Sequence, residues 1–210
     1  MTASSVRAPM KVGIVLFPNV EVLDFAGPFE VFSVASRVAL RDGDLSVAPF
    51  EVSTVAADHL PVVARHGLQV IPNEGISHAP LFDVLIVPGG VMDQPLADEA
   101  LLAYLAKASS YAAITASVCT GAFVLAKLDL LGKRRATTHW EDIDDLKRAH
   151  PDIEVLTNVP FVDEESVVTS AGISAGILMS LHLVERLYGA SLANRTARQM
   201  QFDGWPLTQP

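Results

Sequence analysis

Short apolar runs alternate with helix-like segments along most of this chain, and this alternation constrains its fold most strongly. Residues 11–17, 83–87 and 111–117 are predominantly apolar, which is typical of parallel strands that are buried on both faces. Parallel neighbours need long crossover connections, and segments with apolar residues at helical spacing separate these runs. The pattern therefore predicts an α/β fold with a mostly parallel sheet and helices on both faces, an α/β/α sandwich.

The rest of the chain continues the alternation. Gly27 and Pro28 predict the start of a helix that continues through residues 29–40, because proline favours the first helical turn. Further strands are expected at residues 49–56, within 61–72 around Gly67, and at 134–138, 153–156, 159–162 and 166–169. Further helices are expected at residues 98–110, 122–130, 140–149, 173–188 and 190–200. These elements predict a single domain over residues 10–210, preceded by a flexible leader of residues 1–9.

Composition and charge exclude several classes of function. The 210 residues carry 15 Lys and Arg against 24 Asp and Glu, a formal net charge of −9, which repels a nucleic-acid backbone. No segment approaches the roughly 20 apolar residues that span a membrane. One cysteine cannot form an internal disulfide, and residues 1–9 contain no apolar signal core, so we expect a cytoplasmic protein.

Cys119 is the only cysteine and stands between the expected strand 111–117 and the expected helix 122–130. A sharp turn from strand to helix presents its corner side chain at the carboxyl edge of the sheet, as in a nucleophile elbow. The partial positive charge of the helix N-terminus predicts a thiol pKa below the ordinary value of roughly 8.5. The alternative is a buried thiol that packs as a small hydrophobic side chain.

No motif predicts a cofactor or a metal. GxGxxG and GxxxxGK[ST] are absent from the sequence, and the histidines lack the paired spacing of a zinc site. We therefore expect neither. The acidic run 141–145 is interpreted as a solvated helix face.

Five motifs, in order over about residues 11–200, resemble those of the ThiJ/PfpI family of the class I glutamine amidotransferase-like superfamily. They are residues 23–28 (LDFAGP), 87–90 (VPGG), 117–121 (SVCTG), 134–140 (RRATTHW) and 170–173 (SAGI). Within the family, the chain is similar to isocyanide hydratases and to the ligand domains of AraC-type regulators. The resemblance implies a flavodoxin-like sheet, a stand-alone domain, since the sequence stops at Pro210, and a homodimer.

The resemblance also implies roles for individual residues. Asp24 takes the position of an acid that hydrogen-bonds the thiol or a reacting water; the alternative is that it only holds its loop. The N–H groups of Gly90 and Thr120 are implied as an oxyanion hole, against a simple tight turn at Gly90. The Thr120 hydroxyl orients substrate or water, or else caps the helix.

His139 is implied near the pocket, either as a general base or, more simply, as a packing or capping residue. Proteolytic members of the family have histidine directly after the cysteine, whereas this chain has Thr120 there. This departure argues against protease activity.

These roles favour a cysteine-dependent hydro-lyase of the isocyanide hydratase type, which adds water to a small electrophilic substrate and releases an N-substituted formamide. In that reaction Cys119 attacks the terminal carbon, and Asp24 transfers protons and positions water. A second hypothesis is glyoxalase- or deglycase-like action on α-oxoaldehydes, for which glutamate is the more expected acid. A third is a ligand- or redox-sensing module in which Cys119 is oxidised.

Overall fold

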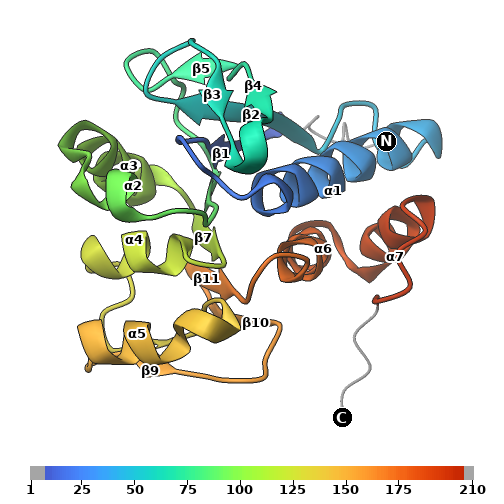
Figure 1. Ribbon diagram of the computed structural model, residues 1–210. Coiled ribbons are helices and arrows are strands. Elements are labelled where there is room, and N and C mark those ends of the chain that lie inside the picture. Colours follow the sequence, from blue (N-terminus) through green and yellow to red (C-terminus); the bar gives the residue numbers. More distant parts are fainter. Residues whose placement is uncertain (1–7, 206–210) are drawn as a thin grey trace.

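The computed structural model describes residues 8–205, and within them a seven-stranded sheet forms the centre of the molecule (Figure 1). The expected leader, residues 1–9, lies outside the described residues except for its last two. The strand order is β10-β11-β7-β6-β1-β2-β5, with β10 and β11 antiparallel and the other neighbours parallel. The strands are β1 (Met10–Val15), β2 (Phe50–Ala56), β5 (Glu74–Gly75), β6 (Val84–Val87), β7 (Ile114–Val118), β10 (Phe161–Glu164) and β11 (Val167–Ser170).

Helices cover both faces of this sheet, which confirms the predicted α/β/α sandwich (Figure 1). One face carries α1 (Val22–Arg41), α6 (Ala175–Tyr188) and α7 (Ala190–Gln199), and the other side carries α2 (Asp93–Ala97), α3 (Glu99–Tyr111), α4 (Gly121–Lys127) and α5 (Ile143–Ala149). Across the described residues, no helix is both long enough and apolar enough to cross a membrane.

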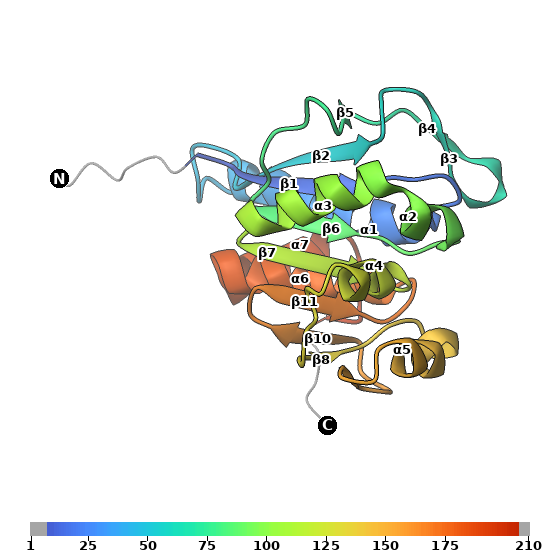
Figure 2. The same ribbon diagram turned by 90° about the vertical axis from the view of Figure 1, so that its left-hand side faces the viewer.

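Short elements extend the loops of the sandwich. They are β3 (Val62–Val63), η1 (Arg65–Gly67), β4 (Gln69–Val70), β8 (Arg135–Ala136), η2 (Trp140–Asp142) and β9 (Glu154–Val155). Figure 2 shows β3, α2 and α5 at the end of the molecule toward which the arrow of β2 points. Since parallel strands all end at this edge, loops that are distant in sequence meet there.

The centre of the sheet is buried and mostly apolar, with Thr115 and Ser117 of β7 as buried polar residues. Every residue of β6 is buried, and so is every residue of β7. Burying a branched side chain such as Ile14 or Ile86, both 0% exposed, contributes about 1.5–3 kcal/mol relative to exposure. The edge loops are thus held by a rigid core.

The first helix begins earlier than the sequence predicts. α1 starts at Val22, so Pro28 lies inside the helix instead of at its first turn. Pro28 has no N–H to donate to the Asp24 carbonyl, so one hydrogen bond of the helix is missing. Packing stabilises this turn instead. Phe25 is buried, and Gly27 lets α1 approach α6 so closely that a Cβ at Gly27 would lie 3.0 Å from Ile177 Cγ1. As a result, Asp24 belongs to a helix and not to a loop.

Candidate active site

Cys119 occupies a strained corner between β7 and α4. Its φ of 56° lies in the left-handed region, which non-glycine residues seldom adopt. The carbonyl of Cys119 accepts a 2.8 Å hydrogen bond from Thr138 Oγ1, and a Cβ on Gly121 would collide with the Val87 carbonyl oxygen. These contacts fix the strand-to-helix elbow that the sequence predicts.

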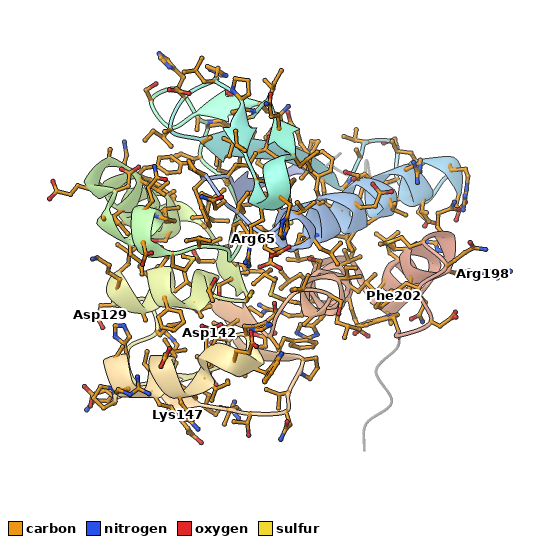
Figure 3. All side chains as sticks on the ribbon, in the orientation of Figure 1. Arg65, Asp129, Asp142, Lys147, Arg198 and Phe202 are labelled. Atoms are coloured by element: carbon orange, nitrogen blue, oxygen red, sulfur yellow. The ribbon has the colours of Figure 1, made fainter. Side chains whose placement is uncertain are left out.

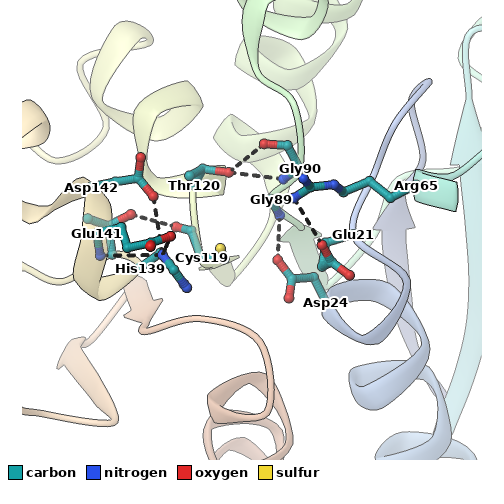
Figure 4. A network of polar contacts seen from close by, with 11 residues as sticks. Glu21, Asp24, Arg65, Gly89, Gly90, Cys119, Thr120, His139, Glu141 and Asp142 are labelled. Carbon is teal, nitrogen blue, oxygen red and sulfur yellow. Dashed lines mark hydrogen bonds and ion pairs between the residues drawn. The ribbon is translucent and has the colours of Figure 1, made fainter.

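The elbow opens into a pocket of about 270 Å³ at the carboxyl edge of the sheet. Arg65 and Asp142 lie near the centre of the molecule in Figure 3, and Figure 4 shows the polar network around the sulfur. The thiol residue itself is only 7% exposed. The pocket is lined by Glu21, Arg65, Gly90, Val91, Cys119, Thr120, His139, Glu141, Asp142 and Ile173.

Asp24 lies beneath this pocket and is fully buried. Its Oδ2 accepts a 3.0 Å hydrogen bond from the Gly89 N–H, whereas its Oδ1 has no hydrogen-bond partner among the described residues. Burial raises the pKa of Asp24 to about 7; the charge of Glu21 adds to the rise, and the Gly89 N–H and the Cys119 thiol oppose it. Asp24 can therefore take up and release a proton near neutral pH.

The thiol pKa contradicts the sequence-based expectation. Burial, followed by the negative charge of Asp24, raises the pKa of Cys119 to about 12, although the backbone and hydroxyl of Thr120 lower it. A helix N-terminus contributes only about 0.3–1 kcal/mol, whereas full burial shifts a pKa by up to about 3–5 units. The expected lowering of the thiol pKa is therefore wrong, because dehydration and a neighbouring carboxylate outweigh the helix.

Cys119 and Asp24 nevertheless form a coupled pair. Transfer of the sulfur proton to Asp24 leaves the net charge of the site unchanged, since a thiolate beside a neutral acid replaces a thiol beside a carboxylate. The pKa of about 7 for Asp24 makes its acid form accessible. The pair can thus produce a nucleophilic sulfur without a free, low-pKa thiol.

Gly90 and Thr120 are brought together, but not as an open oxyanion hole. The Gly90 N–H donates to Thr120 Oγ1 at 2.9 Å, and this hydroxyl donates back to the Gly90 carbonyl at 3.1 Å. The expected donor at Gly90 is therefore engaged, and an oxyanion can use it only after displacing the hydroxyl. The alternative role of the Thr120 hydroxyl as a helix cap is not realised, because Thr120 stands at the N-cap position of α4 but its side chain makes no capping bond.

His139 lines the pocket and caps the segment that follows it. Its Nδ1 accepts a 3.4 Å hydrogen bond from the Glu141 N–H and lies 3.4 Å from Asp142 Oδ2. This geometry matches the capping alternative, with η2 preceding α5 where one helix was expected. Glu141 and Asp142 also line the pocket; the Glu141 side chain is solvated, as the sequence predicts for residues 141–145, whereas Asp142 is partly buried.

Glu21 and Arg65 line the pocket but were not predicted from the sequence. Arg65 Nη1 lies 3.3 Å from Glu21 Oε2, and the Arg65 N–H donates to the Val20 carbonyl at 3.0 Å. Glu21 is the extended residue directly before α1, and its charge contributes to the raised pKa of Asp24. Nothing local predicted Arg65, which reaches the site through η1. Among the described residues, no group of three or more His, Cys, Asp or Glu is arranged to hold a metal ion.

Comparisons with known proteins agree with this fold and identify relatives of the chain. A family model described as DJ-1/PfpI matches residues 10–186. The isonitrile hydratase of Pseudomonas putida is 32% identical over 198 residues, which are 92% of this chain and 78% of that protein. The HTH-type transcriptional regulator GbdR of Pseudomonas aeruginosa is 29% identical over 89% of this chain. The matched region covers about half, 49%, of that regulator's length. A solved ThiJ/PfpI family protein from Pseudomonas syringae superposes with a TM-score of 0.81 at 25% identity, covering 100% of this chain and 81% of that one.

Proposed function

The chain belongs to the DJ-1/PfpI family, and from this premise we propose that it is a cysteine-dependent hydratase of small isocyanides. One observation carries the proposal: the strained Cys119 stands beside Asp24, a buried acid with a pKa of about 7 and an oxygen without a partner. A buried carboxyl with such a raised pKa beside a nucleophile is typical of proton transfer in catalysis. The likeness to an isonitrile hydratase selects the substrate class.

The proposed reaction balances without a cofactor. The Cys119 sulfur forms a bond to the terminal carbon of R–N≡C while Asp24 takes the thiol proton and delivers it to that carbon, giving the thioimidate R–N=CH–S. Water then adds to the same carbon, with Asp24 passing one of its protons to nitrogen. The carbon–sulfur bond breaks, the hydroxyl proton returns to sulfur through Asp24, and R–NH–CHO leaves.

The test is formamide production from an alkyl isocyanide, followed by proton NMR. Cys119→Ala should abolish turnover, and Asp24→Asn should lower kcat by about 10²- to 10⁴-fold, the usual contribution of a general acid–base group. Glu51→Gln, which removes an exposed carboxylate on β2, serves as the control and should leave the rate unchanged. Turnover indifferent to the Cys119 and Asp24 changes would exclude the mechanism.

A second candidate is a ligand-sensing module without turnover. The buried thiol with a pKa of about 12 favours it, as does the likeness to the regulator GbdR over 89% of this chain. Selective thermal stabilisation by small molecules that are not consumed supports this candidate only if a broad isocyanide panel gives no formamide.

We also propose that the protein acts as a homodimer in the cytoplasm. Trp140, a large apolar side chain that is 75% exposed on the monomer, can pack against a second copy. Sedimentation equilibrium at micromolar concentration tests the dimer, and a monomer there would contradict it.

A further inference from the structure

A second cavity of about 310 Å³ lies at the same edge of the sheet and shares no lining residue with the thiol pocket. Its walls come from the loops that follow β1 and β2, from β3, and from α2 and the start of α3. Figure 2 shows β3 and α2 at this end of the molecule. Binding sites in such folds form outside the carboxyl ends of strands, where this cavity also lies.

The lining of this cavity is mostly apolar and partly exposed to water. Leu60 is 68% exposed and Val63 is 46% exposed, although both belong to a concave wall. Apolar concave walls with a few polar groups are the usual surroundings of a small-molecule ligand. The exposed apolar area is thus placed where a ligand can cover it.

The polar groups of the lining restrict the charge of a ligand. Asp58 Oδ1 accepts a 2.8 Å hydrogen bond from the Leu60 N–H, and Asp98 Oδ1 accepts a 3.0 Å bond from the Leu101 N–H. Among the described residues that form the wall there is no Lys, Arg or His. Two carboxylates without a cation repel an anion. Gln94 also lines the cavity, and its side chain has no hydrogen-bond partner within the described part of the chain.

The size of the cavity limits the ligand to one or two rings. An apolar cavity of about 150 Å³ holds benzene, and this one has about twice that volume at about 310 Å³. We propose that the cavity is a second binding site for a small, uncharged, largely apolar molecule of one or two rings, held by one hydrogen bond to Gln94.

Two segments connect this cavity to the thiol pocket. The loop after β1 supplies Phe17 to the apolar cavity and Glu21 to the thiol pocket, and the segment from β3 to η1 supplies Val63 to the former and Arg65 to the latter. The Asn19 N–H donates to the Val63 carbonyl at 2.8 Å, which ties the two segments together. A ligand in the apolar cavity therefore touches the segments that carry Glu21 and Arg65 and leaves the sulfur uncovered.

Indole is a suitable probe, because it is neutral, has two rings and carries one hydrogen-bond donor. Calorimetric titration of the full chain should show binding of indole and at least about tenfold weaker binding of an indole carboxylate. Ala57→Phe fills the cavity from an exposed position and should weaken indole binding by about tenfold or more. Gln94→Leu keeps the space but removes the hydrogen bond, so its expected loss is about three- to tenfold. Ala106→Phe, at an exposed position of α3 outside both cavities, should change nothing.

Three results would overturn this site. The first is equal affinity for indole in wild type, Ala57→Phe and Gln94→Leu. The second is full protection of Cys119 from iodoacetamide by indole, which would locate the probe in the thiol pocket. The third is dissociation of a dimer by Ala57→Phe without indole, which would assign the cavity to a contact with a second copy. None of these measurements uses turnover, so they are independent of the hydratase proposal.

Discussion

Asp24 and Asp163 are both withdrawn from solvent, yet their surroundings give them opposite acidities. Asp163, on β10, accepts two 2.8 Å hydrogen bonds from Arg186 and a 2.9 Å bond from the Glu165 N–H, and it lies 2.6 Å from His182 Nε2. Burial alone raises the pKa of Asp163, but these partners outweigh burial and hold it below its ordinary value. Asp24 has one donor for two oxygens, and its pKa rises to about 7.

The difference separates a structural carboxylate from a reactive one. Both carboxylate oxygens of Asp163 have hydrogen-bond partners, and these partners stabilise the ionised form, so Asp163 stays deprotonated near neutral pH. Asp24 keeps an unpartnered oxygen next to a nucleophile, a costly arrangement that stability alone does not favour. Four predictions test this contrast.

The largest effect is expected on turnover. Asp24→Asn should lower formamide production by about 10²- to 10⁴-fold because the proton-transfer group is lost, whereas Asp163→Asn should keep the wild-type rate. The second variant should instead lose about 1–2 kcal/mol of stability, since it weakens the bonds to His182 and Arg186. Initial rates and urea unfolding measure the two quantities. Equal losses of activity in both variants would show that Asp24 has no special role.

The pH dependence of stability should have opposite signs at the two sites. The pKa of Asp24 rises from 3.8 to about 7 on folding, so the native state binds the proton more tightly, and its stability falls as pH rises between about 4 and 7. The loss amounts to about 4 kcal/mol at most. The lowered pKa of Asp163 gives the reverse: its contribution is present above its unfolded pKa and is lost as pH falls through its folded pKa.

Subtracting the Asp24→Asn variant from wild type isolates the contribution of Asp24. Urea unfolding from about pH 4.5 to pH 8 should show wild type losing stability relative to Asp24→Asn up to about pH 7 and no further change above it. A flat difference across this range would mean that Asp24 is ionised in the native state at every pH tested.

The central sheet was predictable because its signal is local. The branched runs of β1, β6 and β7 are apolar enough to indicate buried strands by themselves. The start of α1 was not, since the local preference of Pro28 for a first turn was overridden by the contact of Gly27 with Ile177, which comes from a distant part of the chain.

In the candidate site, too, the features set by local sequence were predictable and those set by distant contacts were not. The Cys119 elbow followed from one cysteine between a strand-like and a helix-like segment. The pKa of that thiol depends on how tightly distant segments pack around it, and the Arg65–Glu21 contact joins residues 44 positions apart. Sequence patterns indicate which residues meet at an edge, but they do not give the burial that determines charge.

A smaller effect is expected on thiol reactivity. The charge of Asp24 raises the pKa of Cys119, so Asp24→Asn should increase the iodoacetamide reaction rate at about pH 8 by roughly three- to tenfold. Asp163→Asn should not alter it, because Asp163 is not among the groups that shift this thiol. Mass spectrometry of the single cysteine follows the reaction. A slower reaction in Asp24→Asn would reverse the inferred direction of the coupling.

The smallest effect concerns the hydroxyl that occupies the Gly90 amide. Thr120→Val keeps the shape of the side chain but removes its two hydrogen bonds to Gly90, which should cost about 1–2 kcal/mol of stability. In Thr120→Val the Gly90 N–H is free to bind an oxyanion without first displacing a hydroxyl. This gain partly compensates for the lost hydroxyl, so kcat should change by less than about tenfold. Thr120→Ser retains the hydroxyl and should behave as wild type in both measurements. If Thr120→Val instead lowered kcat as much as Asp24→Asn, the Thr120 hydroxyl would take part directly in proton transfer. The buried carboxylate of Asp24 would then not be the only proton-transfer group of the pocket.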